Sequence, residues 1–510
     1  MRLARLNRPL PDGQRLPYAL YRAEQVRRLD RLAIERFGVP GVELMNRAGA
    51  VAYRVLRERW PNARRLTILA GTGNNGGDGY VVARLARADG LDVRLLQLGE
   101  SDRVCGEAAL SLAAYRDAGG VIEDCLGLPR ETDLYVDALL GTGLERPVAG
   151  RWAEAITALN AQRAPVLALD IPSGLHADTG RVLGVAVRAS ATVSFIGLKS
   201  GLFVGAGAEY RGELHFSALD VPAQVYASEI LAAARIDWAR ESRLLAPRSR
   251  MAHKGDCGHV LVVGGAPGMS GAVRLAGESA LRTGAGLVTI ATHPRHADWL
   301  NLDRPELMVS AVAHPDDLEA LIERADVIAI GPGLGRTDWG RGLWERVRAL
   351  PHPLVVDADA LNLLAESPGS GPDWVLTPHP GEAARLLGVT TAEIESDRLA
   401  GAQRLQTRFG GVVVLKGAGS IVHGPAPRVP AVCSDGNPGM ATAGAGDVLT
   451  GVIAALRAQG LEAEDAARAG VCLHAAAGDQ AARAGERGLI ATDIIASLRA
   501  LSNGLTEVDL

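Results

Sequence analysis

The sequence is poor in the features of secreted, zinc-binding and membrane-spanning proteins. Its 510 residues include five cysteines that are far apart and without a C-x-x-C pair: Cys105, Cys125, Cys257, Cys433 and Cys472. This spacing indicates neither a disulfide framework nor a zinc site. The N-terminus lacks the apolar core of a signal peptide, and no apolar run approaches the ~18–20 residues that cross a bilayer. We therefore expect a cytoplasmic protein with no membrane partner.

Charge of one sign is not concentrated anywhere in the chain. The net charge is −4, and acidic and basic residues are mixed along the sequence, which argues against a nucleic-acid partner. An anionic ligand must then be held by local devices, such as the free N–H groups at a helix start. Aromatic residues make up only 4%, whereas the 61 glycines suit an α/β protein whose loops carry the functional groups.

Apolar periodicity predicts a first α/β series in the N-terminal half. Residues 21–58 repeat their apolar positions every three or four residues and are expected to be helical. Short apolar strands then alternate with helices, which predicts a parallel sheet covered on both faces. We expect strands at 66–70, 92–98, 134–138, 166–170, 191–195 and 213–216, with helices near 79–89, 104–118 and 151–162.

A second α/β series follows a junction at about residues 220–250, where the sequence becomes Ala-rich and charged. No internal repeat relates the two halves, so we predict two unlike domains, 1–230 and 231–510. The second domain is expected to have Ala-rich helices within 447–485 and strands at 259–263, 286–291, 327–330, 354–357, 374–377, 412–416 and 420–423.

The segment GTGNNGGDGY (71–80) follows a predicted strand and has the spacing of a dinucleotide-binding glycine loop. Such a motif on its own is weak evidence, because an ordinary nucleotide loop or a capped helix start gives the same pattern. The glycine fingerprint does not require Asn74, Asn75 or Asp78. These three side chains therefore need a further explanation.

The loops after three predicted strands should form one site, because ligands bind beyond the carboxyl ends of parallel strands. Besides 71–80, these loops are VDALLGTGLERP (136–147) and LDIPSGLHADTG (169–180). Asn75, Asp137 and Ser173 offer an amide oxygen, a carboxylate and a hydroxyl, a set suited to a cation near an anionic ligand. Asp170 lies at a strand end, from which its carboxylate can point into the cleft.

The strongest signal is NPGMATAGAGDVLTGVIAAL (437–456). Gly444-Ala445-Gly446 opens a long apolar helix, so free N–H groups and the helix dipole face an incoming anion. Asp447 lies in the first turn of this helix, within reach of that anion. Elsewhere, TPHPGEAARLLG (377–388) places His379 between a strand and a helix, and LKGAGSIVHG (415–424) predicts a tight hairpin.

The three N-terminal motifs resemble, in this order, the epimerase domain of the bifunctional NAD(P)H-hydrate repair enzymes, over roughly residues 20–225. The resemblance implies a Rossmann-like α/β/α domain in which Asn75, Asp137 and Ser173 hold a potassium ion (K+). Asp170 is the candidate for proton transfer at the substrate's carbinolamine, with a simple substrate hydrogen bond as its alternative role. The implied contacts to the hydrated nucleotide are Asp170, Asn74, Asn75, Gly76, Gly77, Asp78, Gly141, Thr142, Gly143, Leu144, Glu145, Arg146 and Pro147.

The second half resembles the ADP- or ATP-dependent NAD(P)H-hydrate dehydratases of the ribokinase-like superfamily, over roughly residues 240–505. The motifs concerned are KGDCGHVLVVGG, SGA, GPGLG, TPHPGE, LKGAGS and NPGMATAGAGDVLTG. The resemblance implies a ribokinase-like α/β/α domain in which Asp447 takes a proton from a hydroxyl, and Mg²⁺ accompanies the nucleotide. Ala272, Gly333, His379 and Asp447 would face the hydrate. ADP or ATP would contact Lys416, Gly417, Ala418, Gly419, Ser420 and Gly446.

Two other functions fit parts of this pattern. The ribokinase-like framework also phosphorylates small vitamin-like alcohols, and the N-terminal domain would then be a non-catalytic binding module. A kinase would accumulate a stable phosphorylated product, whereas a repair enzyme would return the dihydronicotinamide. The sequence leaves open the choices of ADP or ATP and of NADH or NADPH hydrate. We also expect a homo-oligomer, of a size that the sequence does not reveal.

Overall fold

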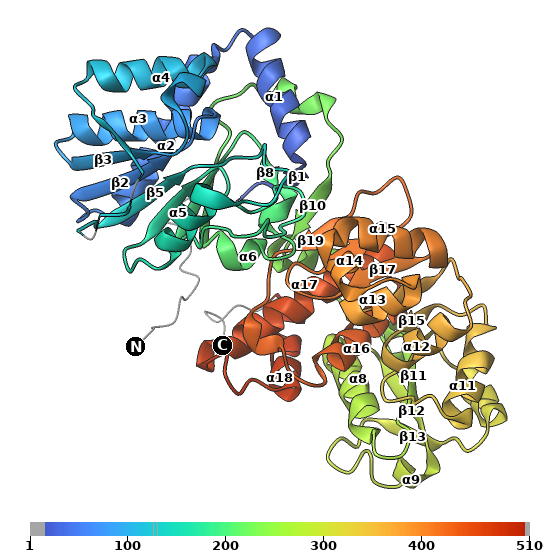
Figure 1. Ribbon diagram of the computed structural model, residues 1–510. Coiled ribbons are helices and arrows are strands. Elements are labelled where there is room, and N and C mark those ends of the chain that lie inside the picture. The colour runs from blue at the N-terminus through green and yellow to red at the C-terminus, as the bar shows by residue number, and fades with distance from the viewer. Residues whose placement is uncertain (1–15, 126, 130, 505–510) are drawn as a thin grey trace. The chain divides into compact units, whose positions relative to one another are not determined.

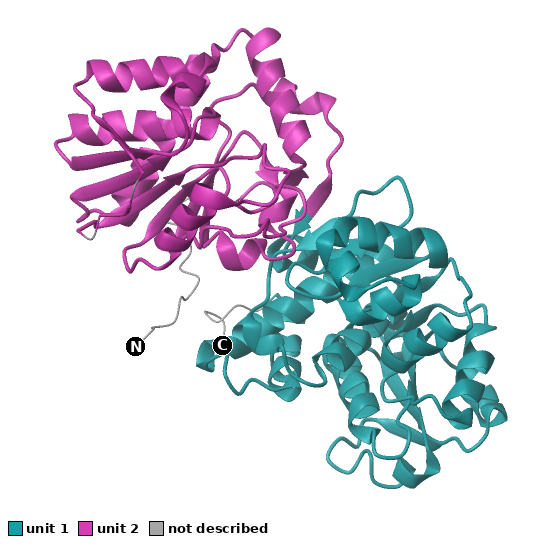
Figure 2. Ribbon diagram, viewed as in Figure 1, with its two compact units in different colours: residues 1–8, 235–510 teal, residues 9–234 magenta. Residues whose placement is uncertain are grey.

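The computed structural model describes residues 16–125, 127–129 and 131–504. These residues divide into two compact units: one ends at residue 234 and is magenta in Figure 2, and the other begins at residue 235 and is teal. In chain order, the magenta unit is called the first unit here and the teal unit the second. The outer limits of the two predicted domains, residues 1 and 510, lie outside the described residues, as does the sequence in which a signal peptide was sought. Among the described residues, no helix has both the length and the apolar composition to cross a bilayer.

The first unit is built on a parallel sheet with the strand order β4-β3-β2-β5-β6-β7-β9. This is the doubly wound order of dinucleotide-binding folds. Successive strands are added on one side of β2 as far as β4 and then on its other side from β5 onward, so the strand order reverses between β2 and β5. The strands are β2 (Arg65–Ala70), β3 (Asp92–Gln97), β4 (Ile122–Asp124), β5 (Leu134–Ala138), β6 (Val166–Leu169), β7 (Ala191–Phe195) and β9 (Glu213–Ser217).

Helices cover this sheet, and a small second ladder extends the unit. In the ladder, β1 (Ala19–Tyr21) pairs in parallel with β8 (Leu198–Lys199) and antiparallel with β10 (Ala233–Ile236). Apolar residues of α2 and α3 join those of the strands in one core, as the 3.6-residue periodicity predicts. The helices are α1 (Ala23–Glu35), α2 (Gly41–Arg59), α3 (Asn74–Ala88), α4 (Gly106–Asp117), α5 (Gly150–Asn160) and α6 (Gly207–Tyr210).

In the second unit, successive neighbours in the sheet are β13-β12-β11-β14-β15-β16-β17-β18-β19. The pairing is parallel as far as β17 and antiparallel at β17–β18 and β18–β19, so the predicted hairpin at 415–424 is confirmed. The strands are β11 (His259–Gly264), β12 (Leu287–Thr292), β13 (Met308–Ala311), β14 (Val327–Ile330), β15 (Leu354–Val356), β16 (Trp374–Leu376), β17 (Val412–Leu415), β18 (Ile421–His423) and β19 (Ala431–Cys433).

Two long helices lie side by side on this sheet. α8 (Ser270–Thr283) and α16 (Ala445–Ala458) pack against each other and against β11, while α17 (Ala463–Ala481) covers the strands from β16 to β19 (Figure 1). Two such α/β/α units confirm the predicted fold class. The remaining helices are α7 (Trp238–Glu241), α9 (Pro294–Ala297), α10 (Glu319–Ile322), α11 (Asp338–Arg348), α12 (Ala358–Glu366), α13 (Pro380–Leu387), α14 (Thr391–Ser396), α15 (Arg398–Phe409) and α18 (Ala491–Ser502).

Candidate active sites

The glycine loop of the first unit lies at the switch point of its sheet. The N–H of Gly71, just after β2, donates to the carbonyl of Ala138 at the end of β5. A Cβ at Gly71 would lie 2.0 Å from Leu139 O, and one at Gly76 would lie 2.1 Å from Gly71 O. Only glycine permits these backbone approaches, so the turn holds the start of α3 close to the loop after β5.

α3 begins at Asn74, five residues before the helix that the sequence predicted, so that expectation is wrong. The asparagine pair and Gly76-Gly77 therefore form the first turn of α3, where free backbone N–H groups gather. Asn74 is exposed at this start, whereas Asn75, Gly76 and Gly77 are buried. The unexpected length follows from the close backbone contact of Gly76, which lets the helix start directly after the strand.

Asp137 and Ser173 form a buried hydrogen-bonded pair, and the buried Asn75 borders the loop that follows Asp137. Asp137 accepts hydrogen bonds from Ser173 N at 2.8 Å, Ser173 Oγ at 2.6 Å and Leu139 N at 3.2 Å. Ser173 Oγ in turn accepts from Leu140 N at 2.8 Å. A Cβ at Gly141 would lie 3.3 Å from the Asn75 Cβ, so the amide borders the same loop.

This cluster has the chemistry of a monovalent cation site. Asp137 is fully buried, and desolvation raises its pKa to about 6 even though its hydrogen bonds oppose the shift. Neither polar atom of the buried Asn75 amide has a hydrogen-bond partner. A buried carboxylate beside an unpartnered amide oxygen fits a potassium ion, which is bound by hard oxygen ligands. Among the described residues, no cluster of three His, Cys, Asp or Glu side chains suits a transition metal.

The second predicted contact loop borders this cluster. Gly141, Thr142 and Leu144 are partly buried. Gly143, Glu145, Arg146 and Pro147 are exposed. Glu145 Oε2 lies 3.8 Å from His176 Nε2, which comes from the loop after β6. The loops after β5 and β6 therefore meet at the strand ends, as expected.

Asp170, directly after β6, is held in an unusual backbone conformation. Its φ is 63°, in the left-handed region that favours glycine. Its carboxylate pairs with the ammonium of Lys199, a buried residue of β8, and accepts from Phe195 N at 3.3 Å. The sequence reasoning missed Lys199.

Two further carboxyl groups face Asp170. Burial, with Asp170 and Asp30 as like charges, raises the pKa of Asp78 well above its usual range. Burial, then Glu107 and Asp170, also raises the pKa of Asp30 on α1. Asp30 was likewise missed, because its helix precedes the strand-end loops in which functional residues were sought.

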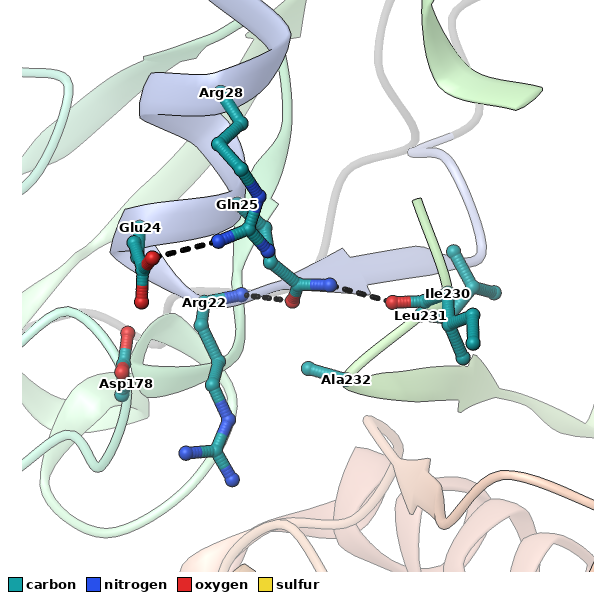
Figure 3. A pocket seen from close by; sticks show the side chains of 8 residues that line it. All are labelled: Arg22, Glu24, Gln25, Arg28, Asp178, Ile230, Leu231 and Ala232. Atoms are coloured by element: carbon teal, nitrogen blue, oxygen red, sulfur yellow. Dashed lines mark hydrogen bonds and ion pairs between the residues drawn. The ribbon is translucent and has the colours of Figure 1, made fainter. Parts of the chain in front are cut away.

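A pocket of about 420 Å³ near the start of α1 is lined by none of the predicted site residues (Figure 3). Gln25 Nε2 donates to Ile230 O, and Arg28 pairs with Glu24 at 2.7 Å. Ala23 N donates to Asp178 Oδ1 at 2.7 Å beside it. These contacts connect α1 to neighbouring segments of the same unit.

In the second unit, Asp447 lies at the helix start where the sequence predicts an anion site. Gly444 precedes α16 with a φ of 86°, and a Cβ there would lie 2.4 Å from Leu275 Cδ1, so glycine is required. Asp447 stands in the first turn of α16, partly exposed. Burial, then the charges of Asp357, Asp359 and Glu382, raises its pKa to about 7 against the opposing effect of Lys416. Such a carboxyl can accept a proton near neutral pH.

A cluster of charged residues lies next to the start of α16, the helix that carries Asp447. Lys416 Nζ, at the end of β17, lies 2.7 Å from Asp357 Oδ1 and 3.9 Å from Glu382 Oε2. Thr450 Oγ1, from α16, donates to Asp357 Oδ2 at 2.8 Å. Asp357, Glu382 and Thr450 were not selected from the sequence, although Asp357 ends a predicted strand and Glu382 ends the TPHPGE motif.

The residues predicted to face the hydrate lie around neighbouring loops. Gly333, with a φ of 55°, would place a Cβ 3.2 Å from the Ala272 Cβ at the start of α8. Gly331, in the same loop, would place one 1.8 Å from Asp357 O. His379 caps α13 through Nδ1, which accepts from Gly381 N at 3.0 Å, and its side chain is 55% exposed. Burial, then the nearby charge of Lys416, lowers the pKa of His379.

The predicted nucleotide loop forms the β17–β18 turn. Gly417 N donates to Ser420 Oγ at 3.2 Å, and Ser420 Oγ donates to Gly417 O, which closes the turn around Ala418 and Gly419. A Cβ at Gly446 would lie 3.4 Å from Lys416 Nζ. Lys416 and Gly446 are therefore adjacent, as their assignment to one ligand requires.

Comparisons with known proteins match both halves of the chain. Residues 260–499 match the family described as NAD(P)H-hydrate dehydratase, and residues 41–201 match the family described as YjeF-related protein N-terminus. The bifunctional NAD(P)H-hydrate repair enzyme Nnr of Coxiella burnetii is 46% identical over 95% of this chain and 99% of its own length. The Escherichia coli K12 enzyme of the same name is 46% identical over 96% of this chain and 95% of its own.

A solved structure supports the fold of the second unit. A ribokinase-like superfamily protein from Enterococcus faecalis V583 matches 54% of this chain and 97% of its own length, with 29% identity and a TM-score of 0.50. The full-length relatives cover both units and both strand-end sites. The chain belongs to the bifunctional NAD(P)H-hydrate repair enzymes.

Proposed function

We propose that the chain repairs hydrated nicotinamide coenzymes in two steps. An epimerase domain, residues 1–230, interconverts the R and S hydrates of NADH or NADPH. A dehydratase domain, residues 231–510, converts the S hydrate back to the coenzyme at the expense of ADP or ATP. The observation that carries the proposal is the presence, in one chain, of both strand-end sites within a family of bifunctional repair enzymes.

In the first step, Asp170 moves a proton at the C6 hydroxyl of the hydrated ring. When the carboxylate takes that proton, the C6–O bond becomes a carbonyl and the electrons of the C6–N1 bond pass to the nitrogen, which opens the ring. Reclosure on the other face, with the proton returned to oxygen, inverts C6. The loop 141–147 and the start of α3, Asn74 to Asp78, bind the nucleotide around this centre.

Asn75, Asp137 and Ser173 would hold K+, which supplies positive charge beside the anionic substrate. The unpartnered Asn75 amide and the buried Asp137 carboxylate support this assignment. The three side chains also join the start of α3 to the loops after β5 and β6. Their role is to fix the relative positions of the substrate-binding loops.

In the second step, Asp447 takes the proton from the C6 hydroxyl as its oxygen attacks the terminal phosphorus of the nucleotide. The free N–H groups at the start of α16, from Gly444 to Gly446, stabilise the negative charge of the transferring group. Hydroxide is a poor leaving group, but phosphate departs when the ring-nitrogen electrons form a bond to C6. Loss of a proton from C5 then restores the dihydropyridine.

Residues 416–420 would bind the adenine nucleotide, and Ala272, Gly333 and His379 would line the hydrate side of Asp447. Mg²⁺ would arrive with ADP or ATP as a counter-ion to the phosphates. The chain would act in the cytoplasm as a homo-oligomer. These assignments rest on the resemblance and on the adjacency of Lys416, Gly446 and Asp447 described above.

The proposal is tested with a mixture of R and S NADH hydrates, given with ADP or ATP and Mg²⁺. Recovery of the whole mixture as NADH, followed by near-ultraviolet absorbance, is the expected result. Recovery that stops at the S fraction would remove the epimerase half of the proposal. A stable phosphorylated product without return of absorbance would instead favour a kinase.

A further inference from the structure

The ammonium of Lys199 is fully enclosed in the first unit. Lys199 is 0% exposed, and its Nζ donates to Ser194 Oγ at 3.1 Å and to Phe195 O at 3.0 Å. Its third contact is with Asp170 Oδ1. A lysine ammonium has three N–H donors, so every one is used and the group is held rigidly.

Asp170 connects this buried charge to the site surface. Its side chain is 17% exposed, whereas that of Lys199 is not exposed at all. Both Lys199 Nζ and Phe195 N donate to Oδ1, so the second oxygen is left for other contacts. A residue other than glycine is strained in this left-handed backbone conformation, so neighbouring contacts must hold Asp170 in place.

Several other charged groups share the surroundings of this pair. Asp30 lies on α1 and Asp78 on α3, and the charge of Lys199 lowers the pKa of both against the larger effect of burial. Glu107 of α4 faces Asp30. Lys199 is thus the positive charge common to carboxyl groups from α1, α3 and the loop after β6.

A lysine at position 199 is unusual for this chain. Lysine occurs at only three positions, 199, 254 and 416, and arginine supplies the other basic residues. The buried Lys199 and the partly buried Lys416 each pair with a carboxylate that directly follows a strand, Asp170 and Asp357 respectively. A compact ammonium can be enclosed by three acceptors, whereas a guanidinium needs more space and carries five donors.

We infer that Lys199 is a positioning residue of the epimerase step, which holds the Asp170 carboxylate in place and aims its second oxygen at the substrate. The inference rests on the proposed function of the first domain. Lys199 is too deeply buried to touch the substrate, so its whole effect passes through Asp170. It predicts a loss in kcat with little change in KM, because nucleotide binding uses other residues.

The test compares Lys199→Met, Asp170→Asn and the double variant in the full chain. Lys199→Met should lower the kcat of epimerisation by about 100-fold or more, the usual contribution of a proton-transfer group. In the double variant, loss of Lys199 should add nothing to the effect of Asp170→Asn.

Controls separate this role from a structural one. Dehydration of the S hydrate by the same protein reports on the second domain, and Arg94→Met removes an exposed ion pair with Glu123 as a matched change. If Lys199→Met unfolds the first domain, two other proteins take its place in the test. These are the double variant, which loses one charge of each sign, and Ser194→Ala. Ser194→Ala should lower kcat several-fold with the KM unchanged.

Two results would overturn the inference. One is a Lys199→Met protein, or a folded Ser194→Ala protein, with the wild-type kcat of epimerisation. The other is a double variant whose loss equals the two single losses combined. Absence of epimerisation in the wild-type chain would instead contradict the proposed function, so the two failures are distinguishable. Lys199→Arg, which keeps the charge but not the shape of the side chain, should also have a lowered kcat of epimerisation.

Discussion

Lys416 Nζ lies 2.7 Å from Asp357 Oδ1, next to the start of α16, the helix that carries Asp447. Burial disfavours the ammonium, but Asp357 and Glu382 outweigh that effect and the pKa of Lys416 is raised. The lysine is therefore charged, and it offsets acidic groups that would otherwise repel phosphates. This charge cluster joins the β17 loop to the start of α16, which carries Asp447.

Lys416→Met should lower the kcat of dehydration by about 100-fold at neutral pH. Lys416 opposes the rise in the pKa of Asp447, so its removal should move the acid limb of the rate to higher pH. The measurement is kcat against pH with the S hydrate. Lys254→Met, at the exposed third lysine, is the matched control and should behave as wild type. An unchanged profile in Lys416→Met would contradict this account of the cluster.

Asp447→Asn should abolish dehydration while epimerisation continues. The asparagine keeps the shape but cannot accept the hydroxyl proton, and a loss of about 100-fold to 10,000-fold is expected. In the wild type, a pKa of about 7 for Asp447 means that the ionised base is depleted as pH falls below 7. Dehydration should then decline about tenfold for each pH unit on the acid side. Retained dehydration in Asp447→Asn would remove this residue from its role.

The Asp137 carboxyl should make the stability of the first domain depend on both pH and K+. Its pKa is 3.8 when unfolded and about 6 when folded, because burial disfavours the charged form. Without a cation, the contribution of Asp137 to stability is therefore fully present below pH 3.8 and is lost, by about 3 kcal/mol, as pH rises through 6. The proposed K+ would bind the ionised form, so it should raise the unfolding midpoint more at pH 8 than at pH 5.

Thermal unfolding with KCl or choline chloride at both pH values provides the measurement. Asp137→Asn removes the titrating group and is the matched control, in which the K+ effect should be small at both pH values. An equal effect of KCl and choline chloride on the wild type at pH 8 would contradict the cation assignment.

Asn75→Leu should separate stability from function at the same cluster. The buried amide has no partner, and an unsatisfied polar group costs on the order of 1–3 kcal/mol. Leucine of similar size should therefore raise the unfolding midpoint in the absence of K+, while the K+ response and epimerisation are lost. Asn74→Leu, at the exposed neighbour, should change the unfolding midpoint and the K+ response less strongly. A K+ response that survives Asn75→Leu would exclude the amide as a ligand.

The sequence predicted most of the sheet because buried parallel strands are short, continuous apolar runs. The strands at Leu134–Ala138, Ala191–Phe195 and Val327–Ile330 were predicted with their observed limits. The strands β1, β4, β8, β10, β13 and β19 were missed. Some of them, such as β4 and β13, contain polar or exposed residues in place of a continuous buried apolar run, so only tertiary pairing defines them. The start of α3 was misplaced because glycines normally disfavour a helix interior.

The candidate sites were predicted unevenly for a similar reason. Motif residues such as Asn75 and Asp447 stand in local glycine-rich patterns, which a sequence displays directly. Lys199 and Asp357 matter through partners 29 and 59 residues away, which only the strand order brings together. The rarity of lysine in an arginine-rich chain was an available signal for Lys199, and its position shortly after a predicted strand was another.

The most direct test of the two-site account supplies pure R hydrate of NADH, with ADP or ATP, to the full chain. Wild type should return NADH completely and faster than an enzyme-free control, because both sites act in turn. Asp447→Asn should give a mixture of R and S hydrates without NADH, and Asp170→Asn should leave the R hydrate unconverted. Persistence of the R hydrate with the wild-type chain would contradict the account.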